Sequence, residues 1–126
     1  MWRKRGKNKY GAKKVEHAGL AFDSQLERAL FDQLSLRQIA GEIQSLTHHP
    51  ATVYLTEARV IYKPDFAFIN AISGEKEWAE AKGFPTPSWA IKKRLWKTYG
   101  PGRLHIYGGS ASRLTLLEVL NPKGTK

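Results

Sequence analysis

Residues 59–82, RVIYKPDFAFINAISGEKEWAEAK, carry the strongest β-strand signal in the chain. The part from Arg59 to Ile69 is dense in Val, Ile, Tyr and Phe, which favour strands. Pro64 lies inside it and predicts a strand edge, a bulge or a break at that point. Residues 70–74 predict a turn, and Glu75 to Lys82 then predicts a returning strand. The stretch is therefore predicted to form a β-hairpin.

The segment before this hairpin predicts a helix from Phe22 to about Ala40. Asp23 or Ser24 can serve as N-cap, and Ser24 followed by Glu27 matches a capping box. The apolar residues that follow, with Phe31 beside them, have the spacing of one helix face. They are Leu26, Ala29, Leu30 and Leu34. Gly41 can end the helix.

The remaining elements predict a sheet flanked by a second helix. Thr86 offers an N-cap, with Pro87 at the first helical position and a stop at Gly100-Pro101-Gly102. Further short strands are predicted at Ile43–Thr47, Thr52–Leu55 and Arg103–Tyr107, whereas Leu114–Leu120 fits either a strand or a helix. This order predicts a mixed α/β fold with a central sheet.

A chain of 126 residues predicts one domain, here residues 16–120, with a flexible basic arm over 1–15 and a tail over 121–126. The absence of cysteine excludes a disulfide scaffold and a Cys-rich zinc site, and it fits a reducing compartment. The basic start is followed by no apolar run typical of a signal peptide, and no stretch of about 20 apolar residues is present. We therefore expect a cytoplasmic protein with no membrane partner.

The formal net charge of +10 predicts a polyanionic partner, most often nucleic acid. Ten of the eleven carboxylates lie between Glu16 and Glu80, with one basic, acid-free segment on each side. A merely solubilising surface would not exclude acids from the 37 residues after Glu80. The residues predicted to contact nucleic acid are Arg3, Lys4, Arg5, Lys7, Lys9, Lys13 and Lys14 in the arm, and Lys92, Lys93, Arg94 and Lys97 on one basic face of the second helix.

Three residues of the hairpin predict a metal site. Side chains alternate along a strand, so Glu80 and Lys82 point to the same side of the sheet. Asp65 comes from the neighbouring strand and can lie beside Glu80. Two carboxylates and the backbone carbonyl of Ala81 would supply hard oxygen ligands for Mg²⁺. The ammonium of Lys82 could orient a water molecule and offset charge on a phosphate.

Glu-x-Lys alone is usually a surface charge pair, and Pro-Asp alone is a common turn. The combination is more specific, because Asp65 stands fifteen residues before Glu80, as a hairpin return requires. Gly83 follows at once and permits close approach of the backbone to a ligand.

The motif formed by Pro64-Asp65 and Glu80-Ala81-Lys82 resembles the signature of the PD-(D/E)xK, or restriction-endonuclease-like, nucleases. Within that superfamily the chain is most similar to small phage-encoded proteins related to phage endonuclease I and to Holliday junction resolvases. The resemblance extends over roughly residues 10–108 and includes the stretches 22–27, 61–66 and 77–83.

The resemblance implies a core with αβββαβ order, a central mixed sheet and flanking helices. It implies that Asp65 and Glu80 bind Mg²⁺, for which Mn²⁺ can substitute, and that Lys82 is the catalytic lysine. It also implies a catalytic role for Glu27, because many of these nucleases carry a further acid on the first helix that reaches the metal directly or through water. Glu27 is alternatively the glutamate of the Ser24 capping box alone, and the two roles are compatible.

The aromatic and His residues outside this motif predict structural roles. Trp89, Leu95, Trp96 and Tyr99 are expected in the core. His48-His49 has no third ligand at zinc-like spacing, so a surface loop pair is expected. His17 has no evident partner, and the sequence assigns His105 no role.

We expect a Mg²⁺-dependent endonuclease that cleaves DNA, selects branched or junction structures, and acts as a homodimer in phage recombination or DNA processing. Paired symmetric nicks require two active sites. No base-reading motif is evident, so strict sequence specificity is not expected. Two alternatives stay open: a nicking or repair endonuclease acting on linear duplex, and a non-catalytic nucleic-acid-binding protein.

Overall fold

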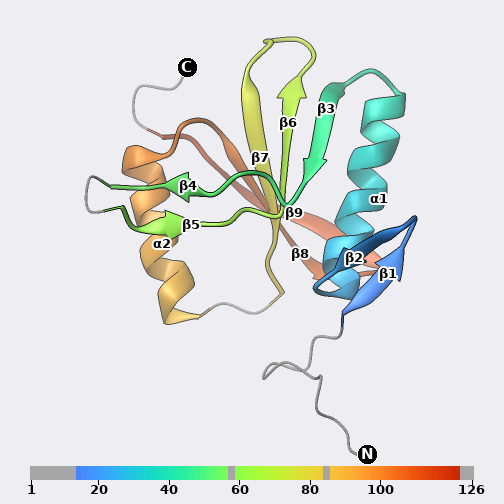
Figure 1. Ribbon diagram of the computed structural model, residues 1–126, viewed down its shortest axis with the longest axis horizontal. Coiled ribbons are helices and arrows are strands. Elements are labelled where there is room, and N and C mark those ends of the chain that lie inside the picture. The colour runs from blue at the N-terminus through green and yellow to red at the C-terminus, as the bar shows by residue number, and fades with distance from the viewer. Residues whose placement is uncertain (1–13, 57–58, 84–85, 123–126) are drawn as a thin grey trace, which may run out of the picture.

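The computed structural model describes residues 14–56, 59–83 and 86–122 (Figure 1). Over these residues the elements in chain order are β1 (Val15–His17), β2 (Leu20–Phe22), α1 (Gln25–Ile39), β3 (Ile43–His48), β4 (Val53–Tyr54), β5 (Ile61–Tyr62), β6 (Phe66–Asn70), β7 (Lys76–Ala81), α2 (Pro87–Tyr99), β8 (Leu104–Ser110) and β9 (Arg113–Leu120). The fold is α/β, as predicted. Of the predicted basic arm, residues 1–13 lie outside the described part of the chain.

A mixed five-stranded sheet, in the order β3-β6-β7-β8-β9, forms the centre of the molecule. β6 and β7 pair antiparallel across the turn at residues 71–75, which confirms the predicted hairpin. β7 and β8 pair parallel, and α2 makes the crossover that a parallel pair requires. β9, which the sequence left unassigned, is an edge strand antiparallel to β8. Without β9, the elements of this sheet and its helices follow the predicted αβββαβ order.

The two helices cover opposite faces of this sheet (Figure 1). Because side chains alternate along each strand, β7 contributes Trp78 to the core under α2 and Ala79 to the core under α1. Trp96 of α2 is fully buried, and its indole N–H donates to the Gly102 carbonyl at 2.8 Å. This contact stabilises the turn after α2. The helix ends before Gly100, as the Gly-Pro-Gly sequence predicted.

The capping predictions agree with the structure in most details. Ser24 caps α1, and its hydroxyl accepts the Glu27 N–H at 3.0 Å. The Glu27 carboxylate returns to the N–H of Asp23 at 3.2 Å rather than to that of Ser24, so the reciprocal bond is displaced by one residue. Thr86 caps α2 and accepts the Trp89 N–H at 3.1 Å.

The strand predicted over residues 59–69 is divided at the buried Pro64. Pro has no N–H to give to a sheet, and the chain changes direction at this point. β5 pairs with β4 in a small separate sheet on the α2 side, whereas β6 enters the central sheet. Asp65 lies at the junction between the two, and the break therefore helps to position it.

A small N-terminal hairpin of β1 and β2 was not predicted. Val15, assigned to the arm from the sequence, begins β1. No helix in the described part of the chain combines the length and the apolar character needed to cross a bilayer.

Candidate functional site

The predicted site lies where β7 continues past the end of β6. The pairing of the two strands ends at Phe66 opposite Ala79, so the next residues of β7 have a free edge. Asp65 fills part of it, because its Oδ2 accepts the Ala81 backbone N–H at 2.9 Å. The N–H and C=O of one strand residue point to the same side. The Ala81 carbonyl therefore faces the side of the strand where Asp65 lies.

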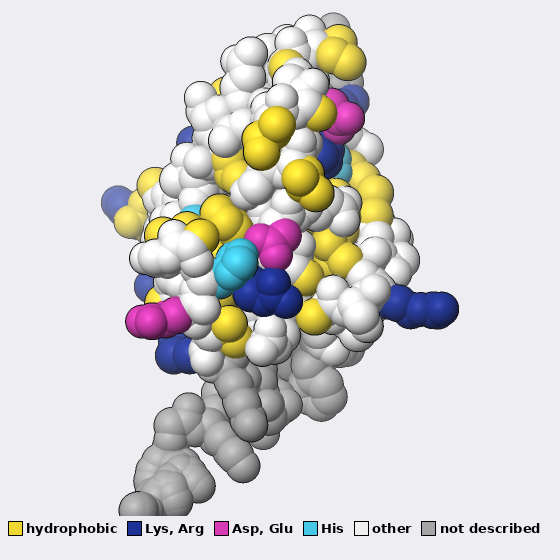
Figure 2. All heavy atoms as spheres, turned by 90° about the vertical axis from the view of Figure 1, so that its right-hand side faces the viewer, with side chains coloured by type: hydrophobic (Ala, Val, Ile, Leu, Met, Phe, Trp, Pro, Cys, Tyr) yellow, Lys and Arg dark blue, Asp and Glu magenta, His cyan; other side chains and the backbone are white. Residues whose placement is uncertain are grey.

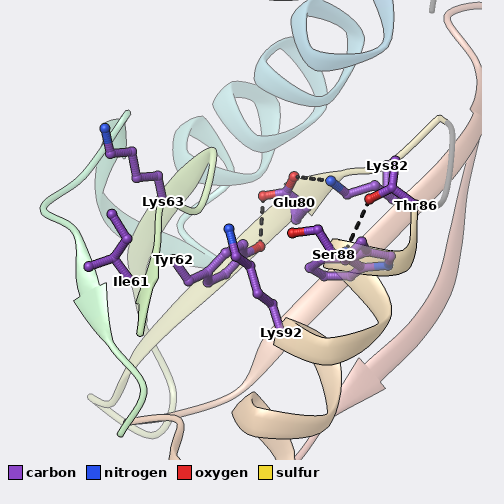
Figure 3. A pocket seen from close by; sticks show the side chains of 9 residues that line it. Ile61, Tyr62, Lys63, Glu80, Lys82, Thr86, Ser88 and Lys92 are labelled. Carbon is purple, nitrogen blue, oxygen red and sulfur yellow. Dashed lines mark hydrogen bonds and ion pairs between the residues drawn. The ribbon is translucent and has the colours of Figure 1, made fainter. Parts of the chain in front are cut away.

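Glu80 is 6% exposed and lies on the α2 face of the sheet. The Tyr62 hydroxyl donates to its Oε1 at 2.7 Å, and the Lys82 Nζ lies 3.2 Å from its Oε2 (Figure 3). The Lys82 ammonium also lies 4.6 Å from the centroid of the Trp89 ring. Glu80 and Lys82 thus share a face as predicted. Tyr62 of β5 contacts Glu80, and Trp89 of α2 contacts Lys82.

The electrostatics of this group are those of two desolvated, neighbouring carboxylates. Burial raises the pKa of Asp65 well above its usual value, and the charges of Glu80 and then Glu27 raise it further. Burial also raises the pKa of Glu80, opposed mainly by Lys82 and then by the Tyr62 hydroxyl. A cation beside both carboxylates would offset the cost of ionising them, so this donor set fits a hard divalent ion.

Burial, and next the charge of Glu80, raise the pKa of Tyr62. Its hydroxyl therefore stays protonated at ordinary pH and remains a donor to Glu80. Sequence reasoning gave Tyr62 no role, although it stands three residues before Asp65. It also gave the Trp89 ring no role beside Lys82. Both contacts join the sheet to elements outside it, so the hairpin pattern alone does not reveal them.

Glu27 lies on the other face of the sheet, on the first turn of α1, and is 2% exposed. Its Oε1 accepts the Asp23 N–H, and its Oε2 accepts hydrogen bonds from His48 Nε2 at 2.6 Å and His49 Nε2 at 2.9 Å. Its charge still contributes to the raised pKa of Asp65. Glu27 therefore caps the helix as predicted and lies near the site, with both carboxylate oxygens hydrogen-bonded.

The expectation of a surface loop pair at His48-His49 is wrong. The His48 side chain is only 10% exposed, and both imidazoles contact the buried Glu27. This arrangement could not be predicted from the sequence, because Glu27 stands 21 residues before His48, on α1.

The other two His residues pair with acids. His17 Nε2 lies 2.9 Å from Asp32, which also binds Arg28. Figure 2 shows the side of the molecule that carries α1, where acidic, basic and His side chains lie together among hydrophobic ones. His105 Nε2 donates to the buried Glu77 at 2.8 Å, on the same sheet face as α1.

Two open pockets flank the carboxylates. One, of about 350 Å³, contains Glu80 and Lys82 between β5 and the start of α2 (Figure 3). The other, of about 380 Å³, contains Asp65 together with Asp23 and His49. Lys63 lines both pockets. The site is therefore accessible from both sides of the Asp65–Glu80 pair.

The predicted basic face of α2 is divided. Lys92 lines the pocket that contains Glu80, whereas Lys93 forms an ion pair with Glu118 of β9. Arg94 and Lys97 are exposed. Consecutive helical residues point about 100° apart, so these four cations cannot all share one narrow face.

The other basic and aromatic predictions have mixed outcomes. Lys14 is exposed and lies 2.9 Å from Asp23, which raises the Lys14 pKa. The predicted contact residues Arg3, Lys4, Arg5, Lys7, Lys9 and Lys13 lie outside the described residues. Trp89 and Trp96 are buried in the core, as predicted. Leu95 is only half-buried against that core, and Tyr99 is 56% exposed and does not belong to it.

The chain belongs to the family described as "Protein of unknown function (DUF1064)", whose match covers residues 7–107. This range includes Glu27, Asp65, Glu80 and Lys82. No curated protein matches the chain.

Proposed function

For this member of the DUF1064 family, we propose a metal-dependent endonuclease activity that hydrolyses DNA phosphodiester bonds, with branched or junction DNA preferred. One observation carries the proposal. Asp65 hydrogen-bonds to the Ala81 backbone at the free edge of β7, directly beside the buried Glu80 that pairs with Lys82. Two acids with a purely structural role would gain nothing from being buried side by side, because their mutual repulsion raises the cost of ionising both.

Asp65, Glu80 and the Ala81 carbonyl are the groups that would hold Mg²⁺, and Mn²⁺ accepts the same oxygen ligands. A bound ion would polarise a phosphate oxygen and lower the pKa of a water ligand. The raised pKa values of the two acids fit this role, because their ionisation is favoured by a cation.

The protein's own side chains would supply positioning and charge. Tyr62 fixes Glu80 by donating to one oxygen, and Lys82 contacts the other. Trp89 limits the positions open to the Lys82 ammonium, which can then orient a water molecule or offset charge on the phosphate. Lys92 lines the same pocket, and a neighbouring DNA phosphate would bind there.

The preference for branched DNA rests on charge and on the basic N-terminal segment. A net charge of +10 favours binding to the phosphate backbone, and a cation-rich N-terminal sequence suits a large, shape-defined substrate. Symmetric cleavage of a junction would require a homodimer with two active sites.

Cleavage of a four-way junction, a flap and a linear duplex, side by side in Mg²⁺, tests the proposal. We expect the wild type to cut the junction most efficiently, and Asp65→Asn and Glu80→Ala to abolish cleavage. Binding measured in EDTA should survive both substitutions, since neither removes a cation. Preference for linear duplex would support the nicking or repair alternative, whereas Mg²⁺-independent binding with no cleavage of any DNA would support the non-catalytic one.

A further inference from the structure

Two consecutive His residues contact one carboxylate oxygen at the end of β3. In a regular strand their side chains would point to opposite faces of the sheet. Here His49 leaves the strand with φ of +54°, in the left-handed region that non-glycine residues rarely adopt. Its backbone N–H donates to the Asp65 carbonyl at 2.8 Å, which holds this conformation. Backbone strain of this kind concentrates at functional sites.

The result is a set of three potential ligand atoms close to one another. His48 Nε2 and His49 Nε2 lie 2.6 and 2.9 Å from Glu27 Oε2, and all three atoms lie within 4.8 Å of one another. Ligand atoms about 2.0–2.1 Å from a tetrahedral ion lie about 3.3 Å apart. Admitting an ion therefore requires each nitrogen to move about 0.4–0.7 Å away from the oxygen, and the two imidazole rings, stacked with centroids 3.7 Å apart, to separate until both nitrogens face the ion.

The surroundings of this group resemble those of a metal centre with one open side. Glu27 and His48 are packed inside, and the His48 ring lies 4.6 Å from that of Phe22 and 5.2 Å from that of Phe66. The His49 side chain is 47% exposed and lines the pocket of about 380 Å³ that also contains Asp65 and Asp23. A ligand from solvent can approach from that pocket, and the exposed imidazole has room for the movement needed.

We propose that Glu27, His48 and His49 form a binding site for one borderline divalent transition-metal ion, represented by Zn²⁺. Imidazole nitrogen suits Zn²⁺ and its neighbours, whereas Mg²⁺ takes oxygen ligands. Two imidazoles with one carboxylate and an open fourth position form a typical catalytic zinc ligand set. This site differs in donor chemistry from the all-oxygen group at Asp65 and Glu80, and it does not depend on the nuclease proposal.

Calorimetric titration of the tag-free protein with Zn²⁺, followed by the visible spectrum with Co²⁺, tests the site. We expect one ion per chain and absorption bands of N/O-coordinated Co²⁺. The decisive variant is His49→Asn, because its side chain is half-exposed and Asn tolerates positive φ. It should weaken Zn²⁺ binding at least about tenfold and remove the bands.

His105→Gln is the matched control, since His105 also contacts a buried glutamate, Glu77, at a similar distance. It should bind Zn²⁺ as the wild type does. The double variant Asp65→Asn/Glu80→Gln should also keep the Zn²⁺ site. The proposal is overturned if micromolar Zn²⁺ does not bind, if His49→Asn binds it unchanged, or if either control loses it. Since none of these readouts uses DNA cleavage, failure of the nuclease proposal would not be mistaken for failure of this one.

Discussion

Tyr62→Phe isolates the hydrogen bond that holds the buried Glu80. The substitution removes one hydroxyl, which donates to Oε1 at 2.7 Å, and keeps the ring that packs 5.6 Å from Trp96 and 5.8 Å from Trp89. A hydrogen bond to a charged group contributes about 1.5–3 kcal/mol. Glu80 is only 6% exposed, although it lines an open pocket, so water replaces the lost donor only in part and we expect a loss within this range.

The expected change in melting temperature follows from the size of the chain. An unfolding entropy of about 2.1 cal/mol/K per residue gives roughly 0.26 kcal/mol/K for a chain of this length. The variant should therefore melt about 6–11 °C below the wild type at pH 8 in EDTA. The difference should shrink as the pH falls through the raised pKa of Glu80, since a protonated carboxyl needs the donor less.

Tyr99→Phe is the matched control, because Tyr99 is an exposed residue of α2. Its free energy of unfolding should stay within about 0.5 kcal/mol of the wild type. Thermal denaturation followed by circular dichroism, from pH 4 to pH 8, measures both variants. Equal melting temperatures for the two variants at pH 8 would refute the reasoning, as would a Tyr62→Phe effect independent of pH.

Two further predictions concern the stability of the metal-free protein. The pKa of Asp65 is raised on folding, so the stability that it contributes is present at low pH and is lost as the pH rises through that pKa. Asp65→Asn keeps an acceptor for Ala81 and should melt above the wild type at pH 8 in EDTA, with a gap that closes toward pH 4; a gap of opposite sign would contradict the assignment. Gly102→Ala should destabilise the fold by about 1–3 kcal/mol in urea denaturation, because the new Cβ would lie 2.7 Å from the Lys76 carbonyl and 2.8 Å from the Trp78 ring. Gly83→Ala meets nothing closer than 3.5 Å and should unfold almost as the wild type does; equal losses for the two alanines would count against the packing argument.

The hairpin and the two helices could be predicted because their signals are local. A dense β-branched and aromatic run, a turn and a second run specify β6 and β7, while Ser24 and Thr86 mark the helix starts. Alternation within β7 then places Glu80 and Lys82 on one face without further information. These parts of the fold and of the site depend only on residues close in sequence.

The short strands could not be predicted in the same way. β1 and β2 have three residues each, and Ala18 and Gly19 between them both take positive φ, as a tight hairpin turn requires. Three residues are too few to show the alternation of a strand, and these strands directly follow the predicted basic arm. The departure of β5 into a separate sheet depends on packing against α2, which the break at Pro64 only suggests.

The group at Glu27 was missed for a conformational reason. Regular alternation would direct His48 and His49 to opposite faces, and only the unusual φ of His49 brings both to one carboxylate. That conformation is held by a backbone bond to Asp65, a residue distant in sequence. The structure therefore adds a second potential ligand group beside the predicted one.

Cleavage of a four-way DNA junction by Lys82→Ala and Lys76→Ala, compared in Mg²⁺, is the most direct test of the central claim. The two lysines belong to the same strand region, and each substitution lowers the net charge by one, but only Lys82 contacts Glu80. We predict that Lys76→Ala cleaves at close to the wild-type rate, and that Lys82→Ala loses cleavage by at least about a hundredfold while still binding the junction. Equal cleavage by the two variants, or no Mg²⁺-dependent cleavage by the wild type, would contradict the assignment of Asp65, Glu80 and Lys82 as a nuclease site.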